Sequence, residues 1–381
     1  AVLAKYENQI NVFSELLDEL PDTEEPLWIL GQRYDVRAEK SELLSDVRSR
    51  LWFTYRKKFS PIGGTGPSSD AGWGCMLRCG QMILAQALVC WHLGREWRWD
   101  KDGRHPEEYR RILHCFLDKK DSCYSIHQMA QMGVGEGKLV GEWYGPNTIA
   151  QVLNVWLFET QPTSVYVSMD NTVVIEDIKK LCHQTGGGML RPALGDPAEP
   201  SEGGAFLEHG SSRPRATSSY PHPYLRSEWK PLLLIIPLRM GINHINPVYI
   251  EALKECFKMP QSLGVLGGKP NLAYYFIGFI GEELIYLDPH TTQLAVESEA
   301  GGAVDDQSYH CNRSPHRMKV TSLDPSVALG FFCKTEEDFD SWCGLVQQVG
   351  TETLTPTSRT SLLWKKQRKH GPSTSFLSRS N

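Results

Sequence analysis

Cys75 is the residue whose surroundings best suit nucleophilic chemistry. It follows a loop rich in glycine, serine and proline (59–74) and stands at the start of an expected long helix, 75–93. The first turn of a helix offers unpaired N–H groups and about half a positive charge, which favours a thiolate over a thiol. Gly74 would let a substrate backbone come close, and Trp73 could shield the site. The pattern predicts a thiol nucleophile; the alternative is a cysteine that merely begins a helix.

His290 is the imidazole best placed to deprotonate such a thiol. It follows an apolar stretch, 284–287, that is typical of a strand. Residues i and i+2 of an extended chain project to the same side, so Asp288 is expected beside His290, where its carboxylate would orient the imidazole and stabilise its cation. Acyl transfer also needs an oxyanion stabiliser. The backbone N–H of Cys75 is available, and the side-chain donor is either Tyr55 or Gln81, between which spacing does not decide.

Two further patterns in the sequence carry weaker signals. Cys75 and Cys79 lie one helical turn apart, but two thiols without a second pair of ligands make a poor zinc site, so we expect neither metal nor cofactor. Either thiol could resolve a sulfenic acid on the other, which makes Cys79 a redox-regulatory candidate and a redox-regulated thiol protein an alternative function. The glycine-rich run 133–138 is one residue short of a phosphate loop, and Leu139 stands where Ser or Thr is needed, so it predicts a turn.

The elements that would position these residues indicate an α+β fold. The middle of the helix 75–93 is almost entirely apolar and small, as expected of a central buried helix, and Gly94 suits its end. An apolar hairpin, 273–280 and 283–288, turns around 281–282. Further strands are expected at 232–238 and 331–333, and amphipathic helices at 5–20, 42–53, 247–257 and 336–349.

Composition narrows the class of protein. The chain has 381 residues, with 40 Lys and Arg against 45 Asp and Glu and a net charge of −5, which argues against nucleic-acid binding through a global positive field. It has no 18-residue apolar run, so we do not expect an integral membrane protein. The 10 cysteines show no framework spacing, which favours a reduced, cytoplasmic protein. The segment 185–227, rich in Gly, Pro and Ser, predicts a flexible inserted loop, and 351–381 a basic, disordered tail.

The stretch 72–82 reads Gly-Trp-Gly-Cys-Met-Leu-Arg-Cys-Gly-Gln-Met and resembles the nucleophile segment of the autophagins. These are papain-like cysteine peptidases that process the ubiquitin-like modifiers of autophagy. Six further stretches match the family in the same order, at 51–56, 131–137, 143–148, 260–264, 267–271 and 287–292. The resemblance covers about residues 5–345 and is closest to the A-type paralogue of vertebrates.

The resemblance implies a papain-like core, with the central helix packed on an antiparallel sheet, in a single catalytic domain 1–350 with a small accessory subdomain at about 97–185. It also implies roles for individual residues. Cys75 would be the nucleophile, His290 the general base, Asp288 the residue that orients it, and Tyr55 the oxyanion donor. The remaining matches would bind substrate, with an aromatic cover over the groove and a mobile loop that lifts on entry: Trp143 for the cover, and Gly267, Gly268, Lys269, Pro270 and Asn271 for the loop.

The implied substrates are GABARAP-type modifiers, cut after a C-terminal glycine to prime them, and the same modifiers conjugated to phosphatidylethanolamine at membranes, released by hydrolysis of that amide. Two departures from the family pattern affect this expectation, the altered segment 151–167 and the basic 364–381, where family chains carry an acidic tail with a docking motif. A catalytically weak relative that binds modifiers without cutting them is therefore the other alternative.

Overall fold

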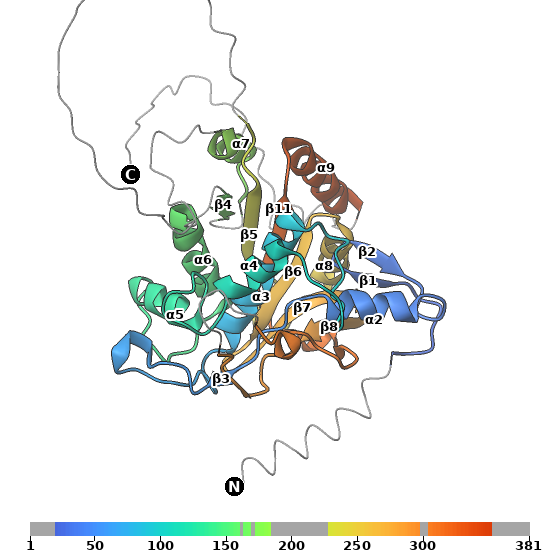
Figure 1. Ribbon diagram of the computed structural model, residues 1–381. Helices are drawn as coiled ribbons and strands as arrows, with labels where there is room; N and C mark the ends of the chain where they lie inside the picture. Colours follow the sequence, from blue (N-terminus) through green and yellow to red (C-terminus); the bar gives the residue numbers. More distant parts are fainter. Residues whose placement is uncertain (1–19, 161–162, 169–171, 184–227, 298–303, 353–381) are drawn as a thin grey trace, which may run out of the picture.

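The computed structural model describes residues 20–160, 163–168, 172–183, 228–297 and 304–352 (Figure 1). Within them lies a nine-stranded sheet whose main path runs β10-β8-β7-β6-β11-β5-β4, with β1 paired to β7 and β2 to β1. All these pairs are antiparallel except β4 with β5. The bounds are β1 Leu27–Ile29, β2 Gln32–Tyr34, β4 Ser164–Val167, β5 Leu232–Arg239, β6 Ser262–Lys269, β7 Leu272–Ile280, β8 Glu283–Leu287, β10 His316–Lys319 and β11 Ser326–Cys333. A separate parallel pair joins β3 Arg56–Lys57 to β9 Gln293–Leu294.

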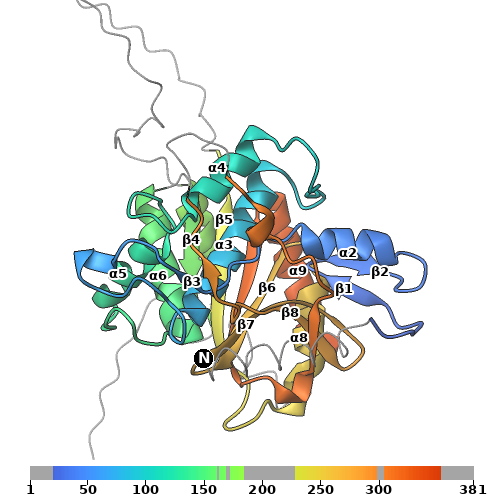
Figure 2. The same cartoon turned by 60° about the horizontal axis from the view of Figure 1, so that its bottom comes forward.

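Helices cover both faces of the sheet, giving an α+β fold in three layers (Figure 2). The alternation along β5 shows the two faces, because Leu233 and Ile235 pack into one core cluster and Leu234 and Ile236 into the other. The first face carries α3 Cys75–His92, α4 Glu107–Cys115, α5 Ile126–Gly135 and α6 Pro146–Thr160. The second carries α7 Ile175–His183, α8 Ile250–Lys258 and α9 Glu336–Glu352.

Helix α3 is central, as its apolar composition predicts. It lies against β6, β7 and β11, and its first 15 residues, from Cys75 to Val89, are all buried. It ends one residue before the expected position, at His92, and Gly94 takes the left-handed conformation (φ 88°) that suits a helix terminus. The hairpin of β7 and β8 around Gly281 is likewise as predicted.

Other elements differ from the expectations in extent. The helix expected over 42–53 is α2 Lys40–Arg48, after which the chain runs through a turn and an isolated bridge at Leu51 without regular structure up to residue 55. The helix expected over 247–257 is a 3₁₀ turn, Pro247–Tyr249, followed by α8, and the strand expected over 331–333 begins at Ser326. The segment 97–185 shares the core of the rest, because β4 joins the main sheet and α6 packs on α3 and β5. The expected helix 5–20 (apart from Leu20), the loop 185–227 and the tail from 353 lie outside the described residues.

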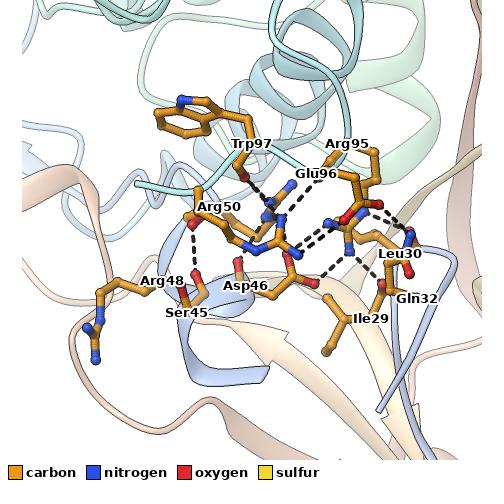
Figure 3. A network of polar contacts seen from close by, with 12 residues as sticks. Ile29, Leu30, Gln32, Ser45, Asp46, Arg48, Arg50, Arg95, Glu96 and Trp97 are labelled. Atoms are coloured by element: carbon orange, nitrogen blue, oxygen red, sulfur yellow. Dashed lines mark hydrogen bonds and ion pairs between the residues drawn. The ribbon is translucent and has the colours of Figure 1, made fainter. Parts of the chain in front are cut away.

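A buried ionic cluster ties the N-terminal elements to the chain that follows α3 (Figure 3). The carboxylate of Asp46 on α2 is fully buried and contacts the guanidinium groups of Arg50 at 3.0 Å, Arg95 at 2.7 Å and Arg98 at 3.2 Å. Arg95 also donates to the backbone oxygen of Ile29 on β1 at 2.7 Å. The cluster therefore fixes how α2 and β1 sit beside α3. No helix among the described residues has the length and apolar character needed to span a bilayer.

Candidate active site

Cys75 is the first residue of α3, and its side chain is fully buried. Gly74 precedes it, and a Cβ at Gly74 would lie only 2.7 Å from the Cβ of Asp70. The absence of a side chain at Gly74 leaves room for the Asp70 side chain. Asp70 in turn accepts hydrogen bonds from the backbone N–H of Arg56 at 2.6 Å and from Nε of Arg78 at 2.8 Å. The loop 59–74 is thereby fastened to the first turn of the helix, and the Cys75 thiol is held at the helix N-terminus, where the unpaired N–H groups favour a thiolate.

Asp288 and His290 lie side by side immediately after β8. The ring Nδ1 of His290 lies 2.5 Å from Oδ1 of Asp288, and the same oxygen accepts the backbone N–H of His290 at 2.9 Å. This is the arrangement that the i, i+2 spacing predicts. With Nδ1 bonded to the carboxylate, the proton-accepting nitrogen of the neutral ring is Nε2.

Nε2 of His290, in the segment after β8, interacts with the thiol of Cys75 at the start of α3. Nε2 is buried and has no hydrogen bond of normal geometry within the described part of the chain. The ring is nevertheless close enough to the thiol for each group to change the pKa of the other. Catalytic hydrogen bonds are often long in a substrate-free site and tighten when substrate binds.

The charges of the three groups support one another. Burial raises the pKa of the Cys75 thiol, but the interaction with His290 and the backbone N–H of Ala273 outweigh burial and hold that pKa below its usual value. Burial lowers the pKa of His290, whereas Asp288 and Cys75 raise it, with a result of about 9. Burial also raises the pKa of Asp288, and the bond to His290 overcomes this and lowers it. The lowered pKa of Cys75 and the raised pKa of His290 both shift the pair toward a thiolate beside an imidazolium, the reactive state of a thiol nucleophile.

Tyr55 and Gln81, the two candidate oxyanion donors, lie in different surroundings. The Tyr55 side chain is buried against the site, with its ring 5.5 Å from that of His290, and both burial and the Cys75 charge raise its pKa, so it stays protonated. The Gln81 amide is already used, since Nε2 donates to the carbonyl oxygen of Tyr124 at 2.6 Å and Oε1 accepts from Arg78 at 3.0 Å. Tyr55, whose hydroxyl interacts with the Cys75 thiol itself, is therefore better placed than Gln81 to donate a hydrogen bond at this site.

The expected substrate-binding residues lie in two places. Gly267, Gly268 and Lys269 end β6, and the chain turns through Pro270 and Asn271 into β7, so the expected mobile loop is the tip of a hairpin. Ala273, just past this tip, directs its backbone N–H at the Cys75 thiol, which places the hairpin beside the nucleophile.

Trp143 lies just before α6. It packs against the core cluster that contains Cys75, and its indole nitrogen is buried without a partner among the described residues. Cys79 is fully buried, and burial raises the pKa of its thiol well above the usual value, which disfavours a thiolate at this position.

Three residues around the site were missed by the sequence analysis. The Trp52 indole donates to the backbone oxygen of Asp288 at 2.7 Å, Tyr274 places its ring 5.3 Å from that of His290, and the Ala273 N–H reaches the thiol. Trp52 stands in one of the stretches that match the family, which was a usable signal. The other two lie in an apolar strand, where nothing in the sequence separates them from core residues.

Comparisons with known proteins agree with this geometry. Residues 40–345 match the family model of the peptidase C54 catalytic domain. The chain is 63% identical over 374 residues to cysteine protease ATG4A of Mus musculus, which covers 98% of this chain and 90% of that protein. It is 68% identical over 332 residues to cysteine protease ATG4A of Gallus gallus, a match that covers 87% of this chain and 84% of that protein. It is 57% identical over 337 residues to cysteine protease ATG4B of the same species, a match that covers 87% of this chain and 82% of that protein. The chain belongs to the peptidase C54 family of papain-like autophagy cysteine proteases, the autophagins, among which it is of the A type.

Proposed function

We propose that this cysteine protease cleaves GABARAP-type ubiquitin-like modifiers after their C-terminal glycine, and that it hydrolyses the amide between the same glycine and phosphatidylethanolamine. The observation that carries the proposal is the Asp288–His290 pair, which leaves one buried imidazole nitrogen free next to a cysteine at a helix N-terminus. Both reactions attack the same glycine carbonyl and differ only in the amine that leaves. We place the protein in the cytoplasm, where these substrates would meet it.

The proposed chemistry follows from the protonation states. The Cys75 thiolate attacks the glycine carbonyl, and the oxyanion that forms is stabilised by the Tyr55 hydroxyl and the backbone N–H of Cys75. The His290 imidazolium gives its proton to the leaving amine as the C–N bond breaks, which leaves a thioester on Cys75. Neutral His290 then takes a proton from water, whose oxygen attacks the thioester and releases the modifier with a free glycine carboxylate. Asp288 holds the ring in the orientation that both proton transfers need.

Preference for glycine fits the backbone of the hairpin tip. Gly268 (φ 139°) and Asn271 (φ 64°) give this tip a compact course beside the thiol. A glycine without Cβ can pass close to such a tip, whereas a larger residue would need the tip to move. Residues 267–270 are therefore proposed as the wall that yields when substrate enters, and Trp143 is proposed as the cover of the groove.

The experiment is incubation of the full chain with a panel of modifier precursors and with modifier–phosphatidylethanolamine on vesicles, with products resolved by mass. We expect scission after glycine in both cases. Cys75→Ala and Cys75→Ser should abolish cleavage while substrate still binds, and His290→Ala should lower turnover by orders of magnitude. Cleavage that survives in the Cys75 variants would refute the mechanism. Modifier binding without any cleavage by the unsubstituted chain would instead identify a binding relative.

A further inference from the structure

A second pair of thiols lies where the chain turns from α4 into α5. Cys115 is the last residue of α4, and Cys123 lies in the turn before α5. The Tyr124 N–H donates to the Cys115 carbonyl oxygen at 2.6 Å, so the backbone returns to its starting point across this turn. The Cys115 side chain forms a hydrogen bond with the sulfur of Cys123. The two sulfur atoms are therefore direct neighbours, although eight positions separate the residues.

Cys123 differs from every other cysteine in its exposure. All 10 cysteines lie in the described part of the chain, and among them Cys123 alone is exposed, while Cys115 and Cys90 are partly buried and the rest are buried. The hydrogen bond from Cys115 lowers the pKa of Cys123 to about 6, whereas burial raises the pKa of Cys256 to about 12. Cys123 thus combines access with thiolate character, the two properties that set thiol reactivity toward peroxides.

We infer that Cys123 and Cys115 form a peroxide-reactive dithiol site that closes to an intramolecular disulfide. The Cys123 thiolate attacks one oxygen of hydrogen peroxide, the O–O bond breaks, and the sulfur is oxidised to sulfenic acid while hydroxide leaves and is protonated to water. The Cys115 sulfur then attacks the sulfenic sulfur. The S–S bond forms, the S–O bond breaks, and the departing hydroxide takes the Cys115 proton as a second water. Two thiols and one peroxide give one disulfide and two waters.

The bridge would close a ring around contacts that support the catalytic helix. Asp118, inside the ring, accepts a hydrogen bond from Arg78 at 2.8 Å, and Tyr124, next to it, accepts one from Gln81 at 2.6 Å. Arg78 and Gln81 lie in the first two turns of α3, which begins at Cys75. Oxidation of the pair would therefore restrain the segment on which the start of α3 rests.

The test exposes the reduced full chain to hydrogen peroxide, alkylates the remaining thiols and maps the peptides by mass. We expect a peptide pair linked through Cys115 and Cys123 that dithiothreitol separates. In Cys115→Ser, which lacks the resolving thiol, sulfenic acid should accumulate on Cys123 and be trapped by dimedone. Cys90→Ser is the matched control, because Cys90 is also a partly buried helical cysteine. That variant should give the linked peptides unchanged.

Two results would overturn the inference. One is oxidation of other cysteines while Cys115 and Cys123 remain fully alkylated. The other concerns the rate of Cys123 alkylation in the untreated protein as a function of pH. A half-maximal rate near the pKa of an ordinary cysteine, about 8.5, instead of near pH 6 would contradict the inference. All readouts are peptide masses and labelling rates, so failure here leaves the proposed protease activity untouched, and failure of cleavage leaves this site untouched.

Discussion

The Trp52 indole N–H donates a hydrogen bond to the backbone carbonyl oxygen of Asp288 at 2.7 Å, across 236 positions of sequence. Beside it, the backbone N–H of Tyr55 donates to the carbonyl oxygen of Pro289 at 2.9 Å. The two bonds fix the segment that carries Asp288 and His290 through its backbone, so both side chains remain available for chemistry. Trp52 is therefore a positioning residue for the imidazole.

Trp52→Phe keeps an aromatic side chain, though a smaller one, and removes the donor, so we expect kcat to fall about tenfold with little change in KM, because misplacing a catalytic group by a fraction of an ångström is costly. The pH at which the rate of Cys75 alkylation reaches half its maximum should also rise, because a displaced imidazole stabilises the thiolate less. Cleavage kinetics and alkylation rates measure the two effects. Trp28→Phe, on β1, is the control, and an equal loss of kcat in both variants would contradict a positioning role.

The sequence could predict the parts of the site that depend on local periodicity. The apolar run inside 75–93 indicates a buried helix that starts at Cys75, and the strand before Asp288 puts its side chain beside that of His290. Both arrangements depend on residues that are close in sequence and need no long-range contact.

Long-range polar contacts explain what the sequence could not predict. The apolar spacing of 42–53 indicates a helix, but the helix ends at Arg48 because the next residues are held by distant partners. Ser49 accepts the backbone N–H of Trp99 at 2.8 Å, and the Arg50 guanidinium donates to Gln86 at 2.9 Å. These bonds hold the chain in the irregular course that leads to Trp52. The meeting of Cys115 with Cys123 likewise depends on the turn between two helices, which cysteine spacing alone does not reveal.

The pH dependence of cleavage should report the thiolate–imidazolium pair. Activity should rise with pH as Cys75 loses its proton, at a pH below that of an ordinary cysteine, and fall as His290 loses its proton near pH 9. Because Asp288 raises the pKa of His290, Asp288→Asn should move the descending limb to lower pH as well as reduce kcat. A pH–rate profile of kcat/KM for both proteins measures this. An unchanged descending limb in the variant would assign it to a different group.

Tyr55→Phe removes one hydroxyl from the site and should lower kcat by about 10²- to 10³-fold, the usual effect of losing an oxyanion donor, with little change in KM. The pKa of Cys75 should rise in this variant, because the Tyr55 hydroxyl is among the groups that lower it. Steady-state cleavage and the pH dependence of Cys75 alkylation give the two values. Gln81→Glu is the comparison variant, although it also removes the hydrogen bond that Gln81 donates to the carbonyl oxygen of Tyr124. A large loss of kcat in Gln81→Glu together with no effect of Tyr55→Phe would assign the oxyanion donor to Gln81 instead of Tyr55.

Gly268→Ala tests the hairpin beside the thiol. Gly268 has φ 139°, and a Cβ there would collide with the carbonyl oxygen of Leu272. We expect the variant to lose about 1–3 kcal/mol of unfolding free energy and to cleave substrate more slowly, because the strained turn displaces Ala273 from Cys75. Gly135→Ala is the control, since nothing lies within 4 Å of a Cβ at that position at the end of α5. Equal stability of the two variants would show that the tip of the hairpin relaxes freely.

Asp46→Asn should be among the most destabilising single substitutions. It leaves the guanidinium groups of Arg50, Arg95 and Arg98 without their shared carboxylate, and loss of one partner from a buried ionic contact costs about 3–5 kcal/mol. Denaturant unfolding measures the loss. Glu96→Gln is the matched control, because Glu96 is exposed and its contact with Arg98, at 3.7 Å, is long, so we expect a change within about 1 kcal/mol.

The stability lost in Asp46→Asn should depend on pH, and that dependence shows whether the loss comes from the charge of Asp46. Burial raises the pKa of Asp46, but Arg50 and its neighbouring guanidinium groups outweigh burial and lower it to about 2. Ionised Asp46 therefore stabilises the fold above the ordinary carboxyl pKa of about 3.9, and this stabilisation disappears as the pH falls toward 2. The gap in unfolding free energy between the two proteins should narrow over that range. A gap that stays constant would mean that the substitution acts through packing and not through the charge of Asp46.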